Sequence, residues 1–183
     1  MNAHTADEVV VLIGLRGSGK TTIGRALAER LHCPWSDLDD RALALCEEAT
    51  IQAVFDGPGA TRWRAAEAEA LESALTDRPG ILSLGGGAPC VPEVVDLLNT
   101  ARRQRRARVI WLDASSECLA RRIGAHDQAR PPLRSHPDGS PLNPLEESQL
   151  LRAERSDTYR ALADRVVDTE PPLEQVLEAI LEP

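Results

Sequence analysis

The sequence predicts an α/β fold in which helices cover both faces of a mainly parallel sheet. Five apolar, strand-like runs lie at residues 9–14, 34–39, 80–85, 108–113 and 165–169, and several of them lack polar alternation. Such runs are typical of strands buried on both faces. Helical patterns lie between them, so strands and helices alternate along the chain. This alternation predicts three layers, right-handed crossovers and ligand binding at the carboxyl ends of the strands.

Length and composition indicate one globular domain over residues 1–183, with 42% hydrophobic and 27% charged residues. No apolar run approaches the length of a membrane span, and the first ten residues lack the features of a secretory signal. We therefore expect a cytoplasmic protein without a membrane partner. The four scattered cysteines (Cys33, Cys46, Cys90 and Cys118) are expected to be reduced.

Two of the helical segments, 21–31 and 61–75, place their apolar residues on a single stripe. One segment does not fit the alternation: residues 126–144 are rich in proline and polar side chains. A loop of this length inside a compact domain is usually functional or disordered. We interpret it as a mobile lid.

The segment GLRGSGKTT (14–22) matches the phosphate-binding pattern GxxxxGK[ST], between an apolar strand and a helix. Glycines let successive backbone N–H groups turn around phosphate oxygens, and the start of the helix adds partial positive charge. Lys20 is the only lysine in the chain, and its compact ammonium suits the β and γ phosphates. Thr21 would place its hydroxyl on Mg²⁺. The residues expected to bind the nucleotide here are Gly17, Ser18, Gly19, Lys20, Thr21 and Thr22.

Two carboxylates at the end of the second predicted strand indicate phosphoryl transfer. Asp37 and Asp39 are two residues apart, so on a strand they would point to the same side. One can hold Mg²⁺ through water, while the other orients an acceptor hydroxyl and takes its proton. The alternative is that Asp40, or less readily Asp39, caps the following helix. The chain has no NKxD stretch of the kind that reads guanine in GTP-binding switches.

Further motifs follow in a specific order: WR, an apolar strand running into GGG, an RPxL segment and ERxxxY. Together with the phosphate loop and DxD, this order resembles the shikimate kinase family over nearly all of residues 8–170. The resemblance implies ATP- and Mg²⁺-dependent phosphorylation of the 3-hydroxyl of shikimate, on the way to chorismate and the aromatic amino acids. It also implies a P-loop kinase fold like that of the nucleoside-monophosphate kinases, with a five-stranded parallel sheet. We expect a monomer.

The resemblance assigns roles to residues that bind the acceptor. It implies that Asp39 contacts the substrate hydroxyls and acts as base, with Asp37 near the metal. Arg64 would hold the shikimate carboxylate, a task suited to a guanidinium. Trp63 stands where the family commonly has phenylalanine and would line the substrate. After the third predicted strand, the resemblance implies that backbone approaches the bound ring at Gly85, Gly86 and Gly87, for which a plain turn is the alternative.

Arginines carry the remaining assignments. Arg130 resembles the lid arginine that stabilises charge on the transferring group, although RPPL stands here where the family has RPLL, and Arg134 is an alternative. Arg155 resembles a second carboxylate-binding arginine; on the residues alone, a solvated helix face is an equal alternative. Arg122 would lie along adenine, with Arg121 the competing choice.

Two other classes of function stay open from the sequence. A kinase of another small polyol acid, such as gluconate, shares the loop and the fold. A regulatory module that binds nucleotide without turnover is suggested by the atypical lid.

The basic run at 102–108 resembles a nucleic-acid patch, but it follows a helix and the net charge is −8, so we expect no nucleic-acid partner.

Overall fold

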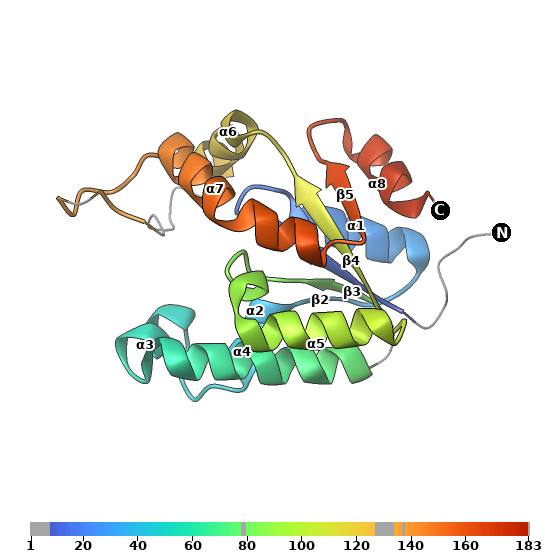
Figure 1. Cartoon of the computed structure of the whole chain (residues 1–183), viewed down its shortest axis with the longest axis horizontal. Coiled ribbons are helices and arrows are strands. Elements are labelled where there is room, and N and C mark those ends of the chain that lie inside the picture. The colour runs from blue at the N-terminus through green and yellow to red at the C-terminus, as the bar shows by residue number, and fades with distance from the viewer. Residues whose placement is uncertain (1–7, 78–79, 127–133, 137, 183) are drawn as a thin grey trace.

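A five-stranded parallel sheet forms the centre of the molecule. The computed structural model describes residues 8–77, 80–126, 134–136 and 138–182. Within them the sheet has the order β2-β3-β1-β4-β5, and all four neighbouring pairs are parallel (Figure 1). The strands are β1 (Val9–Ile13), β2 (Trp35–Asp37), β3 (Ile81–Ser83), β4 (Ala107–Asp113) and β5 (Arg165–Asp168). The predicted sheet is therefore confirmed.

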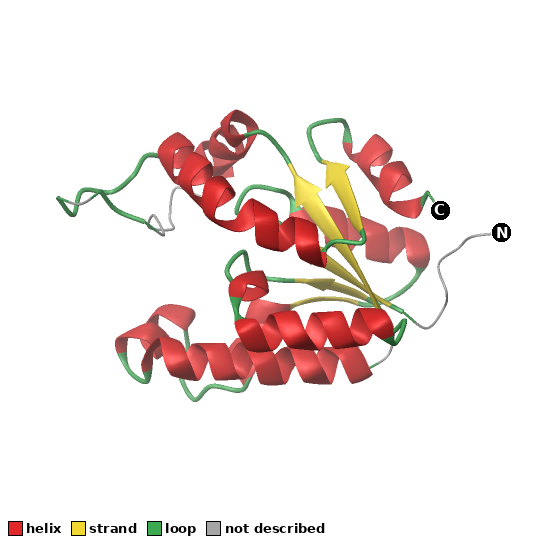
Figure 2. Ribbon diagram, in the orientation of Figure 1, coloured by secondary structure: helices red, strands yellow, loops and turns green. Residues whose placement is uncertain are grey.

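Helices lie on both sides of this sheet (Figure 2). They are α1 (Lys20–Leu31), α2 (Leu38–Ala44), α3 (Ile51–Asp56), α4 (Gly59–Thr76), α5 (Pro92–Arg103), α6 (Ser116–His126), α7 (Pro144–Leu162) and α8 (Leu173–Leu181), with a 3₁₀ turn at Ala88–Cys90. The two helical segments identified in the sequence correspond to α1 and α4. Among the described residues, no helix is both long and apolar enough to span a membrane.

The alternation of side chains along β1 divides the core into two parts. Val10 and Leu12 pack with residues of α1 and α8, whereas Val11 and Ile13 pack with residues of α2, α4, α5 and α7. Because successive side chains of a strand point to opposite faces, a run of apolar residues buries both faces at once. The three-layer arrangement follows from this pattern.

The second strand is shorter than expected. It ends at Asp37, and Asp39 lies in the first turn of α2. Asp37 has extended backbone, and its Oδ1 accepts a hydrogen bond from the Asp39 N–H at 3.0 Å, which makes it the N-cap of α2. The prediction that both aspartates lie on one strand is therefore wrong, and so is the alternative that Asp39 or Asp40 is the cap.

The expected lid is described only in part. Residues 127–133, including Arg130, lie outside the described residues, as does residue 137. On the two sides of residue 137, the His136 N–H donates to the Ser140 carbonyl at 2.8 Å, and Ser135 pairs with Pro141 in an antiparallel bridge. Asn143 and Glu146 then form a capping box that begins α7.

Candidate active site

The phosphate-binding loop joins β1 to α1 in a backbone conformation that requires glycine. Gly17 and Gly19 have φ angles of 82° and 90°, a region that L side chains rarely adopt. A side chain on Gly14 would meet the Leu112 carbonyl oxygen at 2.5 Å. The loop is thus held against the end of β4 and leads directly into the first turn of α1.

Two polar side chains of this loop fit a bound phosphate chain. The Lys20 ammonium donates to the carbonyl oxygens of Gly14 and Leu15, at 2.9 and 3.0 Å. The charged end of Lys20 is therefore held inside the loop. Ser18 Oγ is buried without a hydrogen-bond partner among the described residues. Buried polar atoms normally have partners. An anion at the start of α1 would meet the Lys20 ammonium and the positive end of the helix dipole.

The Asp39 carboxylate lies directly against the loop that follows β3. A Cβ added to Gly85 would be 2.4 Å from Asp39 Oδ1 and 3.1 Å from its Cγ. Only glycine at this position leaves the carboxylate where it is. The structure therefore brings Asp39 and the predicted glycine triplet together, although Asp39 lies on a helix rather than on a strand.

Gly86 joins this loop to the phosphate-binding loop and to α7. A Cβ on Gly86 would lie 3.4 Å from the Gly14 carbonyl oxygen and 3.5 Å from Arg155 Nη1. The Gly86 carbonyl accepts hydrogen bonds from Arg155 Nη1 at 2.7 Å and from the Tyr159 hydroxyl at 2.5 Å. Burial raises the pKa of Tyr159 to about 12, so its hydroxyl is a proton donor at neutral pH.

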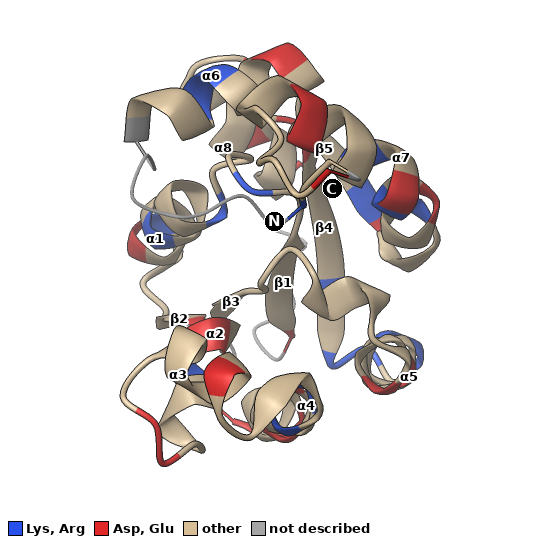
Figure 3. Ribbon diagram, turned by 90° about the vertical axis from the view of Figure 1, so that its left-hand side faces the viewer, with Lys and Arg blue, Asp and Glu red and all other residues tan. Residues whose placement is uncertain are grey.

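A cavity of about 510 Å³ opens beside this junction. Three arginines line it, Arg64, Arg134 and Arg155, together with Gly87 and Cys90. Arg64 is carried by α4 and Arg155 by α7, two helices that pack on the same face of the sheet and lie apart from each other in Figure 3, which is turned by 90° from Figure 1. Guanidinium groups bind carboxylates through paired hydrogen bonds. Glu93 and Glu154 line the cavity too, so the three guanidinium groups leave its lining with a net positive charge, which suits a small organic anion.

A buried carboxylate orients the first of these arginines. Arg64 Nη1 lies 2.5 Å from Glu67 Oε2, and the Glu67 side chain is only 2% exposed. Burial raises the pKa of Glu67, and the Arg64 guanidinium opposes that rise. The pair fixes Arg64 at the cavity wall, and a Cβ on Gly87 would come within 3.4 Å of Arg64 Nη2.

Arg122 connects the phosphate-binding loop to the end of β5. Its Nη1 donates to Thr169 Oγ1 at 3.0 Å and to the Gly17 carbonyl at 3.4 Å, and its Nη2 donates to the Thr169 carbonyl. The competing Arg121 is instead directed at Cys118 Sγ, 3.3 Å away. Of the two arginines, Arg122 is the one beside the predicted nucleotide site.

Comparison with known proteins agrees with this geometry. Residues 16–183 match the family model described as "Shikimate kinase". The chain belongs to the shikimate kinase family. A shikimate kinase from Stenotrophomonas maltophilia is 39% identical over 162 residues, which are 88% of this chain and 83% of the relative. Another, from Symbiobacterium thermophilum, is 36% identical over 94% of both chains. The resemblance identified from the motifs is confirmed.

The fold of solved shikimate kinases matches as well. The structure of shikimate kinase from Acinetobacter baumannii in complex with shikimate has a TM-score of 0.78 and 27% identity, covering 95% of this chain and 90% of the other. The P-loop kinase fold expected from the sequence is thus also confirmed.

Some residues of this shikimate kinase site lie elsewhere than expected, or were not identified from the sequence. Trp63 is 4% exposed and belongs to the core, so it does not line the cavity as expected; the neighbouring Phe55, at a ring distance of 6.2 Å, is the exposed aromatic. Glu67 was not singled out, and its only sequence signal is helical spacing, three residues after Arg64. Tyr159 ends the ERxxxY motif, four residues after Arg155, but no role was assigned to it.

Proposed function

We propose that this member of the shikimate kinase family transfers the γ-phosphoryl group of ATP, bound with Mg²⁺, to the 3-hydroxyl of shikimate. The observation that carries the proposal is the contact chain at Gly85 and Gly86. Gly85 lies against the Asp39 carboxylate, and the adjacent Gly86 lies against the phosphate-binding loop and against Arg155, which lines the cavity. A hydroxyl acid seated in that cavity would present a hydroxyl between a carboxylate and the end of the phosphate site.

Each group then has a defined task. Arg64 and Arg155 would bind the acceptor carboxylate, while Asp39 would orient the reacting hydroxyl and accept its proton. Lys20 would move from the loop carbonyls to the phosphates and neutralise charge on the transferring group. Thr21 and Asp37 would hold Mg²⁺; because Asp37 also caps α2, its carboxylate would serve both the metal and the helix. Arg122 would contact the nucleotide base.

Closure over the two ligands would exclude water, so that the phosphoryl group reaches the acceptor instead of being hydrolysed. We assign this task to residues 126–144, with Arg130 or Arg134 as the arginine that reaches the phosphates. Arg134 lines the cavity, where its Nη2 is 3.0 Å from Glu154 Oε2.

We further propose that one unit, residues 1–183, acts as a monomer in the cytoplasm, without a nucleic-acid partner. All four cysteines are free, and the cytoplasm is a compartment that keeps thiols reduced.

An ADP-release assay with Mg²⁺ and ATP tests the proposal, comparing shikimate, gluconate and no acceptor. We expect turnover with shikimate only. Arg64→Ala should mainly raise the KM for shikimate, and Asp39→Asn should mainly lower kcat. Turnover with gluconate would favour a polyol-acid kinase. Tight ATP binding without turnover on any acceptor would favour a regulatory module.

A further inference from the structure

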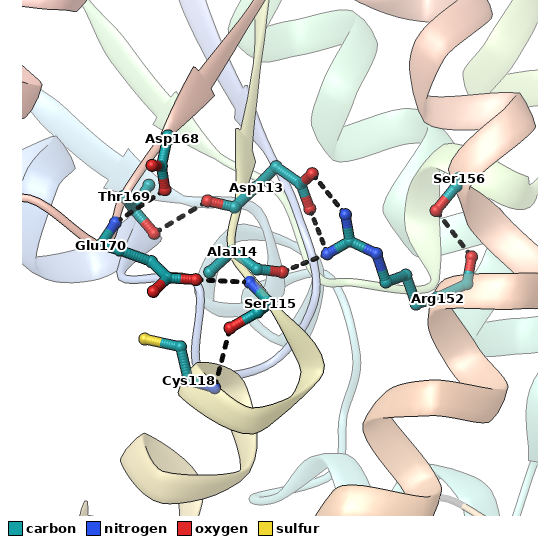
Figure 4. Close-up of polar contacts among 9 residues, drawn as sticks. All are labelled: Asp113, Ala114, Ser115, Cys118, Arg152, Ser156, Asp168, Thr169 and Glu170. Carbon is teal, nitrogen blue, oxygen red and sulfur yellow. Dashed lines mark hydrogen bonds and ion pairs between the residues drawn. The ribbon is translucent and has the colours of Figure 1, made fainter.

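A bidentate ion pair between Arg152 and Asp113 joins α7 to the carboxyl end of β4 (Figure 4). Neither residue lines the cavity. Arg152 Nη1 and Nη2 lie 2.8 and 2.7 Å from the two carboxylate oxygens of Asp113, and Nη1 also donates to the Ala114 carbonyl. The two side chains are 34% and 21% exposed. Bidentate pairing fixes orientation as well as distance, because both N–H groups must meet both oxygens.

The strand end that carries Asp113 is itself held in place. The Asp113 carbonyl accepts hydrogen bonds from the Thr169 N–H at 2.9 Å and from Thr169 Oγ1 at 3.1 Å. Two residues later, the Ser115 N–H donates to Glu170 Oε1 at 2.8 Å. Arg122 binds the same Thr169 and reaches Gly17 of the phosphate-binding loop. Asp113 is thus a fixed point connected to the nucleotide side of the site.

Arg152 occupies the same face of α7 as the residues that reach the acceptor side. It precedes Arg155 by three residues and Tyr159 by seven, which is the spacing of neighbours on one helical face. Arg155 and Tyr159 both donate to the Gly86 carbonyl, and Arg155 lines the cavity. One face of α7 therefore binds both the end of β4, at Asp113, and the loop after β3, at Gly86. These two strands flank β1 in the sheet.

We propose that Asp113 and Arg152 are positioning residues for acceptor binding. They fix the position of α7 along its own axis and its rotation about that axis. This places Arg155 against the acceptor carboxylate and the Gly86 loop. The inference rests on the proposed function, because it names Arg155 as an acceptor ligand. Neither Asp113 nor Arg152 is among the residues that line the cavity, so they act through Arg155.

An ordinary partly exposed ion pair would stabilise the fold slightly and leave substrate binding unchanged. The chain offers such a pair as a control. Arg102 of α5 binds Asp164 through Nε and Nη2, at 2.9 and 2.7 Å, with side chains 23% and 33% exposed. Asp164 precedes β5, so this pair lies at the opposite end of the sheet from Asp113.

The test compares Asp113→Asn, Arg152→Gln, the double variant and the control Asp164→Asn in steady-state assays with shikimate and ATP. We expect Asp113→Asn and Arg152→Gln each to raise the KM for shikimate at least about tenfold, since small displacements of binding groups have large effects. The KM for ATP should stay within about twofold. The double variant should resemble either single variant, because both changes release the same contact. Asp164→Asn should keep the wild-type KM values.

Hydrogen exchange supplies a readout that needs no acceptor. Peptides covering residues 84–91 should exchange faster in Asp113→Asn than in Asp164→Asn, because Arg155 and Tyr159 would lose their hold on the Gly86 carbonyl. If wild-type protein turns over shikimate and the two variants match in KM and exchange, the inference is wrong. If wild-type protein does not turn over shikimate but Asp113→Asn still loosens residues 84–91, the acceptor assignment is wrong and the positioning contact stands.

Discussion

Replacing Gly85 by alanine should impair chemistry far more than binding or folding. The added Cβ would lie 2.4 Å from Asp39 Oδ1, whereas ordinary contacts begin at 3.4 Å, so the carboxylate must withdraw by about 1 Å. A displacement of that size in a reacting group costs about 100-fold in rate. Gly85 has no positive φ, and the obstructing atoms belong to the end of a side chain, so alanine adds no backbone strain. We expect kcat to fall by about 100-fold and the KM for ATP to stay unchanged.

The control is Gly124→Ala in α6, where an added Cβ meets no atom of the described residues within 4 Å. This variant should keep wild-type kcat and be slightly more stable, because alanine favours helix over glycine by about 1 kcal/mol. Both variants are measured by ADP release at saturating shikimate and ATP, with thermal unfolding alongside. A Gly85→Ala protein that folds normally and retains kcat within twofold of wild type would refute the assigned role of Asp39.

Three further predictions concern single side chains. Tyr159→Phe should make the free energy of unfolding depend less on pH above pH 10. In the folded protein the pKa of Tyr159 is about 12, above its ordinary value of 10. The stability that this group contributes is therefore fully present below pH 10 and is lost as the pH rises toward 12. Chemical unfolding across that range measures it, and equal slopes for both proteins would contradict it. Glu67→Gln should raise the KM for shikimate about tenfold, because Arg64 loses its ionic partner; an unchanged KM in the ADP-release assay would count against this. Lys20→Arg should reduce kcat at least about 100-fold in the same assay, because a wide planar guanidinium is a poor substitute for the compact ammonium that would neutralise charge on the phosphates, and near-normal turnover would argue against it.

The sheet and the phosphate-binding loop could be predicted from the sequence because their signals are local. Apolar runs indicate strands buried on both faces, and the glycines of the loop stand directly between one such run and a helix. The end of β2 could not be placed in this way. Asp37 fits either a strand or an N-cap, and its hydrogen bond to the Asp39 N–H decides between them.

The parts of the site that the sequence did not reveal depend on contacts between distant segments. Asp113 and Arg152 are 39 residues apart, and nothing near either residue indicates a partner. Tyr159 belongs to the ERxxxY motif, but its task becomes visible only in the hydrogen bond from its hydroxyl to the Gly86 carbonyl. Trp63 was expected to line the substrate because it stands where the family commonly has phenylalanine, but it lies next to Arg64 on a helix, where neighbouring residues point in different directions.

The single lysine also makes the phosphate-binding loop chemically addressable. Apart from the N-terminus, Lys20 carries the only amine in the chain, and its Nζ lies between two backbone carbonyls. An amine-selective acylating reagent therefore has one side-chain target, so the mass of the peptide that contains Lys20 reports directly on that site. Bound nucleotide would shield the amine, and the rate of labelling would become a measure of nucleotide occupancy that requires no catalysis.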